Sequence, residues 1–150
     1  MFTNGILEII LALLCIVLAL TASGFLTAEN LLNVLRNVSM QGVIAFGMTM
    51  VIISGEIDLS VGSAVAFSAC LTAFLTQKLV AEWASLPIAL AIAIAIVFAL
   101  IVGFFLGVFT GFMRTRYRVP SFITTLALMT GLSGAAELIT NGFPLTPFPG

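Results

Sequence analysis

Two carboxylates, Glu56 and Asp58, lie close together in residues 51–63, VIISGEIDLSVGS, within a chain that carries few other charges. A carboxylate near the hydrocarbon region of a membrane is energetically costly, so its presence favours a functional role. Such groups could line a cavity on a solute path, or carry protons or cations. Metal sites and nucleophilic triads lack their usual residues, because the sequence has no histidine and two isolated cysteines. We expect no cofactor, no metal and no enzymatic activity of this chain.

Asp58 also has a structural explanation. Gly55 can end the preceding helix, and aspartate is a good N-cap. The sequence therefore predicts a helix that starts at Leu59, with the Asp58 carboxylate accepting hydrogen bonds from free backbone donors in its first turn. Glu56 has no such local role. Two interpretations stay open: a helix cap with Glu56 at the membrane interface, and a turn that lines a cavity.

The composition is that of a membrane protein. Of the 150 residues, 61% are hydrophobic and only 7% are charged, and the mean hydropathy is +1.29. A water-soluble domain would carry roughly 25% charged residues. Most of the exposed surface must therefore face the lipid bilayer. The net charge of -1 gives no sign of a nucleic-acid partner.

The apolar residues form segments that are each long enough for a helix to cross a bilayer core about 30 Å thick. These segments are residues 5–26, 31–53, 59–77, 83–113 and 119–139. Helices are required because backbone groups in lipid must be satisfied within the segment. The predicted fold is all-α, a polytopic transmembrane bundle of about five helices.

The orientation follows from the cations between the fourth and fifth segments. Arg114, Arg116 and Arg118 form the sequence RTRYR, and the positive-inside rule makes this a cytoplasmic loop. The amino terminus is then cytoplasmic and Lys78 lies outside. Residues 27–38 could lie along the outer interface, which would place the turn with the two carboxylates below the membrane surface.

Small residues recur at every fourth position of the fourth segment, where they predict a ridge that a neighbouring helix can approach closely. The ridge consists of Ala91, Ala95, Ala99, Gly103, Gly107 and Gly111. The third segment has a weaker ridge, Ser60, Ala64, Ser68, Thr72 and Thr76, and the fifth has Ala127, Gly131 and Ala135.

Hydroxyl side chains in otherwise apolar helices could face a solute path. The candidates are Ser121, Thr124 and Thr125 after Pro120, and Ser60 near the turn. The alternative is that each hydroxyl bonds to the backbone of its own helix.

The stretch SGEIDLSVGS resembles the signature GGIDLSVGS of the membrane permease subunits of bacterial ABC importers for ribose, other monosaccharides and autoinducer-2, in the branched-chain amino acid/sugar permease family. The flanking sequence NLLNVLRNVSMQGVIAFGMTMVIISGEIDLSVGS and the later VPSFITTLALMTGLSGAAELITNGFP also resemble this family. We call the turn that contains the signature the signature turn. Its candidate functional residues are Gly55, Glu56, Asp58, Ser60, Gly62 and Ser63. Glu56 is a departure, because the family usually has glycine there.

The resemblance implies a permease of about ten helices in the bacterial inner membrane. Such a subunit works by alternating access with a second permease, in a homodimer or heterodimer, two cytoplasmic ATPases and a periplasmic binding protein. Residues 1–150 would be the amino-terminal half of its transmembrane domain, ending in an outer loop at 141–150. ATP hydrolysis would belong to a partner, because the chain's lysine, Lys78, follows Gln77 rather than the glycine of a P-loop.

The function implied is passage of a small polar solute, a monosaccharide. Two other classes stay open. An ion-coupled secondary transporter could use Glu56 and Asp58, and a non-transporting membrane scaffold would need only the small-residue ridges.

Overall fold

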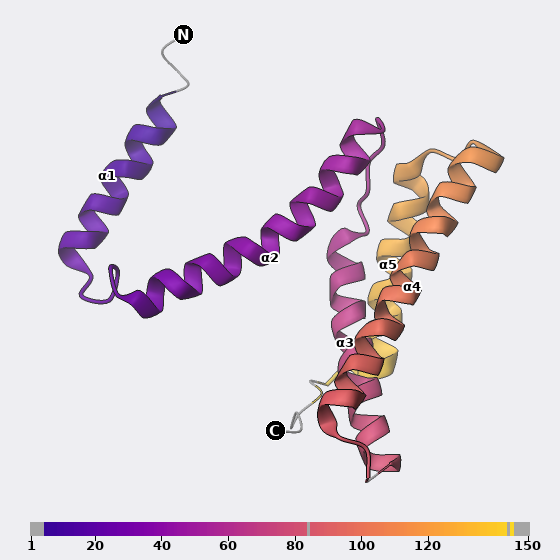
Figure 1. Cartoon of the computed structure of the whole chain (residues 1–150). Coiled ribbons are helices and arrows are strands. Elements are labelled where there is room, and N and C mark those ends of the chain that lie inside the picture. The colour runs from indigo at the N-terminus through magenta and orange to yellow at the C-terminus, as the bar shows by residue number, and fades with distance from the viewer. Residues whose placement is uncertain (1–4, 84, 144, 146–150) are drawn as a thin grey trace. The chain divides into compact units, whose positions relative to one another are not determined.

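The computed structural model describes residues 5–83, 85–143 and 145, and this part of the chain contains five helices and no strand. The helices are α1 (Ile6–Thr21), α2 (Ala28–Ile53), α3 (Val61–Glu82), α4 (Ile88–Tyr117) and α5 (Ser121–Thr140), shown in Figure 1. Four of them, α2 to α5, are long and apolar enough to cross a membrane. The all-α membrane-helix fold is thus confirmed. The outer loop predicted at 141–150 lies largely outside the described residues.

The helix α1 is shorter than the predicted segment 5–26. It has 16 residues, which gives a length of about 24 Å at 1.5 Å per residue, against a bilayer core of about 30 Å. The helix stops because Ala22 takes an extended backbone, with φ -104° and ψ 108°. The Ser23–Gly24 pair that follows is a common turn signal. The expectation of a full-length first crossing was therefore wrong in its length.

The helix α2 is continuous through the region where the sequence suggested a surface segment followed by a short crossing. Thr27 precedes the helix, and its hydroxyl oxygen accepts the Asn30 backbone N–H at 3.3 Å, as an N-cap does. The helix then continues past Ser39, whose hydroxyl donates to the Leu35 carbonyl at 2.7 Å. Residues 27–38 are thus the cap and first turns of one helix.

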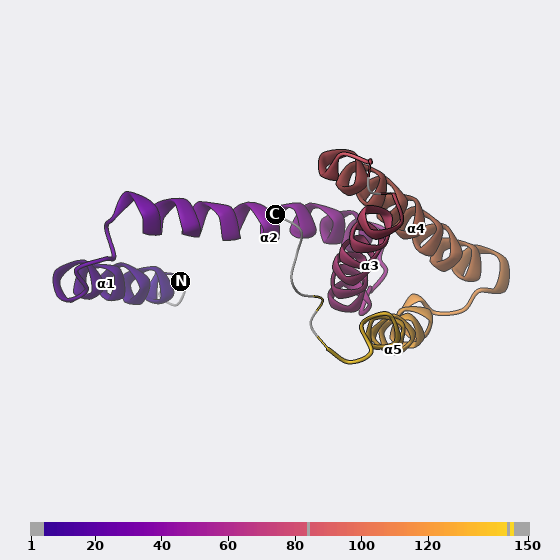
Figure 2. The same cartoon turned by 90° about the horizontal axis from the view of Figure 1, so that it is seen from below.

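The chain forms two compact units, Met1–Gly47 and Met48–Gly150. In the second unit α3 packs against both α4 and α5, which contact each other much less. Figure 2 shows α3 between the other two helices. The buried apolar residues of the second unit are mostly small: Leu71, Ala91, Ala95, Ala99, Leu132 and Ala136. Small side chains let helix backbones approach closely where no hydrophobic effect drives association.

The ridge on α4 divides into two halves. Its alanines are buried, with Ala91 and Ala95 fully inaccessible. Its glycines, Gly103, Gly107 and Gly111, are not buried, and a Cβ placed on any of them would meet no atom within 4 Å in the described part of the chain. The described part of the chain contains no helix packed closely against these glycines, so close packing there stays a prediction.

The face of α5 that packs is not the predicted one. Its buried residues are Ser121, Thr124, Thr125, Leu132 and Ala136. Ala127 and Gly131, two members of the predicted ridge, are exposed instead. The small size of a residue permits burial but does not specify it, because lipid accepts an alanine as readily as a helix does.

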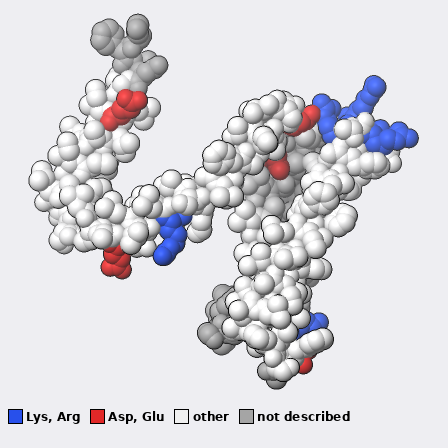
Figure 3. Space-filling view, in the orientation of Figure 1, with Lys and Arg blue, Asp and Glu red and all other residues white. Residues whose placement is uncertain are grey.

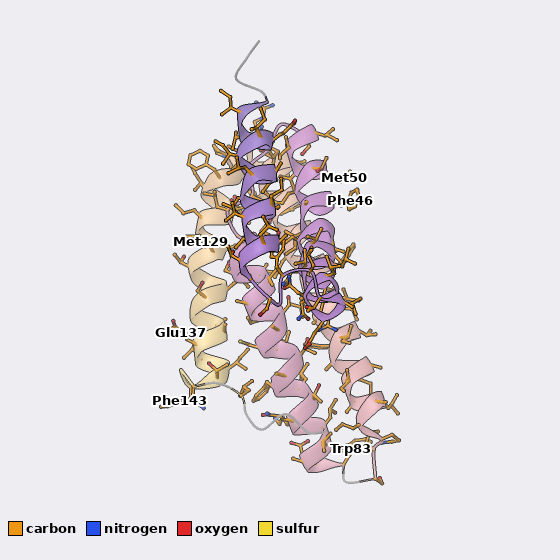
Figure 4. All side chains as sticks on the ribbon, turned by 90° about the vertical axis from the view of Figure 1, so that its left-hand side faces the viewer. Phe46, Met50, Trp83, Met129, Glu137 and Phe143 are labelled. Carbon is orange, nitrogen blue, oxygen red and sulfur yellow. The ribbon has the colours of Figure 1, made fainter. Side chains whose placement is uncertain are left out.

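Aromatic side chains mark both ends of α4 and its connections. Trp83, which follows α3 and is labelled in Figure 4, is 62% exposed, and Tyr117, the last residue of α4, is 60% exposed. The 30 residues of α4 correspond to about 45 Å, the thickness of a bilayer with its headgroups. Tryptophan and tyrosine favour that interface. The two ends of α4 are therefore suited to the two membrane surfaces.

Candidate functional site

The signature turn begins with a Schellman motif at the end of α2. The Gly55 N–H donates to the Ile52 carbonyl at 2.9 Å, and the Glu56 N–H donates to the Val51 carbonyl at 3.2 Å. Gly55 has φ +74°, a left-handed conformation that residues with a Cβ rarely adopt. The prediction that Gly55 ends the helix is confirmed.

Asp58 lies two residues before the N-cap position of α3, and not at the N-cap as predicted. The helix α3 starts at Val61, not Leu59, and Ser60 occupies the N-cap position. The Asp58 Oδ1 atom accepts the Ser60 N–H at 2.7 Å and the Ser60 hydroxyl at 2.6 Å. This two-residue reach is an Asx turn, which competes with helix formation at these positions. The carboxylate therefore accepts a backbone hydrogen bond as expected, but Asp58 precedes the N-cap residue and is not the N-cap itself.

The other residues of the signature turn support the start of α3. Ser60 and Ser63 are buried, and the Ser63 hydroxyl donates to the Ser60 carbonyl at 2.8 Å. Gly62 is exposed in the first turn. The Ser60 hydroxyl thus bonds to the Asp58 side chain and not to the backbone of its own helix, which was the alternative expected from the sequence.

Two hydroxyls of α5 hold the backbone of the signature turn. The Ile57 N–H donates to Ser121 Oγ at 3.1 Å, and the Leu59 N–H donates to Thr125 Oγ1 at 3.2 Å. Ser121 and Thr125 are one helical turn apart and lie on one face, and they are 8% and 1% exposed. Backbone outside a helix needs such partners, because it lacks the internal bonds of a helix. These two hydroxyls therefore fasten a segment more than 60 residues away in sequence.

Glu56 forms an ion pair with Arg114, in the last turn of α4. The Glu56 side chain is 24% exposed and the Arg114 side chain 47%. A hydrogen bond from the Ser121 hydroxyl and the neighbouring Arg114 guanidinium lower the pKa of Glu56 below its ordinary value. Glu56 is therefore ionised at neutral pH. Sequence reasoning missed this pair, although the predicted topology already placed both residues at one membrane surface.

A cavity of about 250 Å³ lies between the signature turn, α4 and α5. Its lining residues are Val51, Ser54, Glu56, Ile57, Asp58, Gly107, Thr110, Gly111, Arg114, Ser121 and Thr125. Both carboxylates and two of the three candidate hydroxyls of α5 belong to this wall. Thr124 is buried but is not part of it. The signature turn thus combines the two alternatives, since Asp58 bonds backbone and the turn lines a cavity.

The remaining arginines lie at the same end of α4. The Arg116 guanidinium lies 5.8 Å from the centre of the Tyr117 ring, within the range of a cation–π contact. Arg118 ends the helix in a left-handed conformation, with φ 56°. Figure 3 shows basic side chains, in blue, gathered at this end of the second unit beside acidic ones, in red. Cations at this position also interact favourably with the carboxyl end of the helix dipole.

Gly103 lies apart from this cavity. It lines a separate hollow of about 440 Å³ between α3 and α4, together with Ser68, Thr72 and Ala99. The three glycines of the ridge therefore belong to two different surfaces of α4. Among the described residues, no three His, Cys, Asp or Glu side chains lie close enough together to hold a metal ion.

Residues 30–145 match the family described as "Branched-chain amino acid transport system / permease component". The chain belongs to this family. The match includes the whole lining of the 250 Å³ cavity, and α1 lies before it. The resemblance seen in the signature turn is thus confirmed as family membership.

Curated members of this permease family align with nearly all of the chain. The probable ABC transporter permease protein YphD of Escherichia coli (strain K12) is 45% identical over 93% of this chain and 39% of its own length. The ribose import permease protein RbsC of Bacillus subtilis (strain 168) is 41% identical, over 91% of this chain and 39% of its own. The xylose transport system permease protein XylH of Escherichia coli (strain K12) is 35% identical, over 85% and 30%. The chain therefore spans about two-fifths or less of these relatives, and no solved structure matches it significantly.

Proposed function

We propose that this chain is part of the membrane-spanning permease subunit of an ABC importer and lines part of the path of a monosaccharide. The observation that carries the proposal is the family match over residues 30–145. The similar proteins include a ribose import permease and a xylose transport system permease. The cavity beside the signature turn supports the proposal, because polar side chains form part of its lining. Hydroxyl, carboxylate and guanidinium groups can exchange hydrogen bonds with the hydroxyls of a sugar.

The complete assembly that we propose contains a second permease, cytoplasmic ATP-binding subunits and a periplasmic binding protein, in the bacterial inner membrane. Residues 1–150 belong to the amino-terminal half of the permease's transmembrane domain. The amino terminus lies in the cytoplasm. The placement of the signature turn and the three arginines at one end of the second unit is compatible with this topology, since both loops would then face the cytoplasm.

The structure of the site disfavours the ion-coupled alternative. A proton carrier must change its charge during transport, yet Glu56 is paired with Arg114 and Asp58 already accepts two hydrogen bonds from Ser60. The Arg114 guanidinium stabilises the ionised form of Glu56, and the Asp58 carboxylate already serves the turn that precedes α3. The two carboxylates therefore suit a structural role better than proton exchange.

The test is uptake by the full-length protein, reconstituted in proteoliposomes with its ATP-binding and binding-protein partners. We expect uptake of a ribose or xylose probe that requires ATP hydrolysis and persists when ion gradients are collapsed. Vesicles without the ATP-binding subunit are the control. Uptake that follows the ion gradient and ignores ATP would contradict the proposal, and so would an absence of uptake for a broad panel of monosaccharides.

A further inference from the structure

The signature turn is connected to its neighbours in two different ways. Its backbone is held by α5, through hydrogen bonds from Ile57 and Leu59 to buried hydroxyls. Its connection to α4 is an ion pair between side chains, Glu56 and Arg114. The Ser121 hydroxyl of α5 also hydrogen-bonds Glu56, but Arg114→Gln would remove the ion pair and leave the bonds of Ile57 and Leu59 to α5 in place. The two connections can therefore be broken separately.

The space between the signature turn and the last turns of α4 contains little else. Gly107 and Gly111 form the α4 side of the cavity and have no side chains. The Thr110 hydroxyl also lines the cavity, but it donates to the Leu106 carbonyl of its own helix at 2.9 Å. The Glu56–Arg114 pair therefore bridges a gap that packing does not fill. Both members are partly exposed, so the pair lies at the rim of the cavity.

The surrounding charges make this pairing specific. Arg114 shares its end of α4 with Arg116 and Arg118, so Glu56 compensates one charge of a repelling group. Asp58 lines the same cavity but uses its Oδ1 atom to bind Ser60. Among the described residues Glu56 is the carboxylate that is ion-paired with Arg114.

We propose that Glu56 is a positioning residue whose ion pair with Arg114 holds the signature turn against α4 and restricts entry to the cavity. Breaking the pair lets the end of α4 move away from the turn, so the cavity opens more often. In the importer this opening would uncouple ATP hydrolysis from solute movement. That last consequence rests on the proposed function, whereas the opening itself does not.

The experiment measures access to the cavity directly. Thr110→Cys is placed in the full-length protein, in a background without Cys15 and Cys70, and a membrane-impermeant thiol reagent is added to each side of membrane vesicles in turn. We expect Glu56→Gln and Arg114→Gln each to raise the labelling rate by about threefold, a change typical of the loss of one exposed ion pair. The double exchange Glu56→Arg with Arg114→Glu should restore the parent rate.

The matched control is Glu82→Gln, which removes the partner of Lys78 in an ion pair at the far end of α3. It should leave labelling at position 110 unchanged. Equal labelling of Glu56→Gln and the parent, the same increase in the control, or no rescue by the double exchange would each overturn the proposal. If Thr110→Cys impairs folding, Ser54→Cys on the opposite wall provides the same measurement.

Transport provides an independent readout. Glu56→Gln should raise the ATP hydrolysed per solute moved, and the double exchange should reverse this change. An unchanged ratio together with increased labelling would contradict the uncoupling. If the labelling pattern holds while no variant and no parent shows uptake, the proposed function fails and the positioning role stands.

Discussion

Gly55, Glu56 and Asp58 of the signature turn each have a distinct structural task. Gly55 reverses the chain in a left-handed conformation, and Asp58 orders the entry to α3 through Ser60. Glu56 extends to Arg114 on another helix. Because these tasks use different atoms, substitutions at neighbouring positions should have separable effects.

At Asp58 the decisive property is the acceptor oxygen. An asparagine side chain would retain that oxygen, so Asp58→Asn should leave the melting temperature nearly unchanged, whereas Asp58→Ala should cost about 1 kcal/mol of local stability, as a lost cap does. Thermal unfolding of the purified full-length permease measures both. Loss of uptake in Asp58→Asn without a change in stability would show that the charge itself is required.

At Glu56 the pH dependence follows from its lowered pKa. The hydrogen bond from Ser121 and the Arg114 guanidinium lower this pKa below its ordinary 4.5. A carboxyl group of this kind adds stability above its unfolded pKa and loses it as the pH falls through the folded value. The ratio of labelling rates at position 110 between Glu56→Gln and the parent should therefore be constant from about pH 6 to about pH 8. It should approach one only below pH 4.5, and a change of the ratio near neutral pH would contradict the assignment.

At the scale of the helices, the second unit is held together by small side chains. The buried alanines of α4 face the packed side of the unit, while large apolar residues such as Leu100 and Phe104 are exposed. Membrane helices associate through close packing rather than through the hydrophobic effect. Stability should therefore depend on the size of residues at the buried positions and hardly at all on size at the lipid-facing ones.

Ala95 and Ala93 provide a matched pair for this test, because the first is fully buried and the second is exposed. Ala95→Leu should destabilise the protein by about 1–3 kcal/mol, the usual cost of overpacking. Ala93→Leu should have little effect. The melting temperatures of the two variants, measured in the same detergent, test this expectation. Equal melting temperatures would show that close packing at the buried alanines does not contribute to stability.

At the scale of the whole molecule, the distribution of charge favours one orientation. Arg114, Arg116 and Arg118 lie at one end of α4, and Lys78 lies near the opposite end of the unit, close to the end of α3. Positively charged loops stay in the cytoplasm. The unit thus has three cations at one end and one near the other, which favours a cytoplasmic position for the end with the arginines.

Single-cysteine labelling tests this orientation in a background without Cys15 and Cys70. Arg116→Cys should react with an impermeant reagent only from the cytoplasmic side, and Lys78→Cys only from the periplasmic side. Reaction of position 116 from the periplasm would reverse the topology. The Glu56–Arg114 pair would be unaffected by such a reversal, because it depends on the two residues lying at one end and not on which side that end faces.

Local chemistry in the sequence was enough to predict several features. Low charge and long apolar runs predicted the membrane helices, because such surfaces are stable only in lipid. The glycine at position 55 predicted the end of α2, since few other residues accept a positive φ. The sequence motif around Glu56 and Asp58 indicated the permease family, and the match over residues 30–145 confirmed it.

The tertiary structure alone decided which side chains meet. Ser121 and Thr125 accept backbone N–H groups of the signature turn, although the Thr125 hydroxyl also donates within its own helix, to the Phe122 carbonyl at 3.3 Å. Glu56 and Arg114 are 58 positions apart. These contacts depend on how far α4 and α5 are rotated about their own axes against α3. In a soluble helix an apolar stripe reveals that rotation, but here both the packed face and the lipid face are apolar. Rotation is then determined by close packing across all three helices, which no single helix sequence contains.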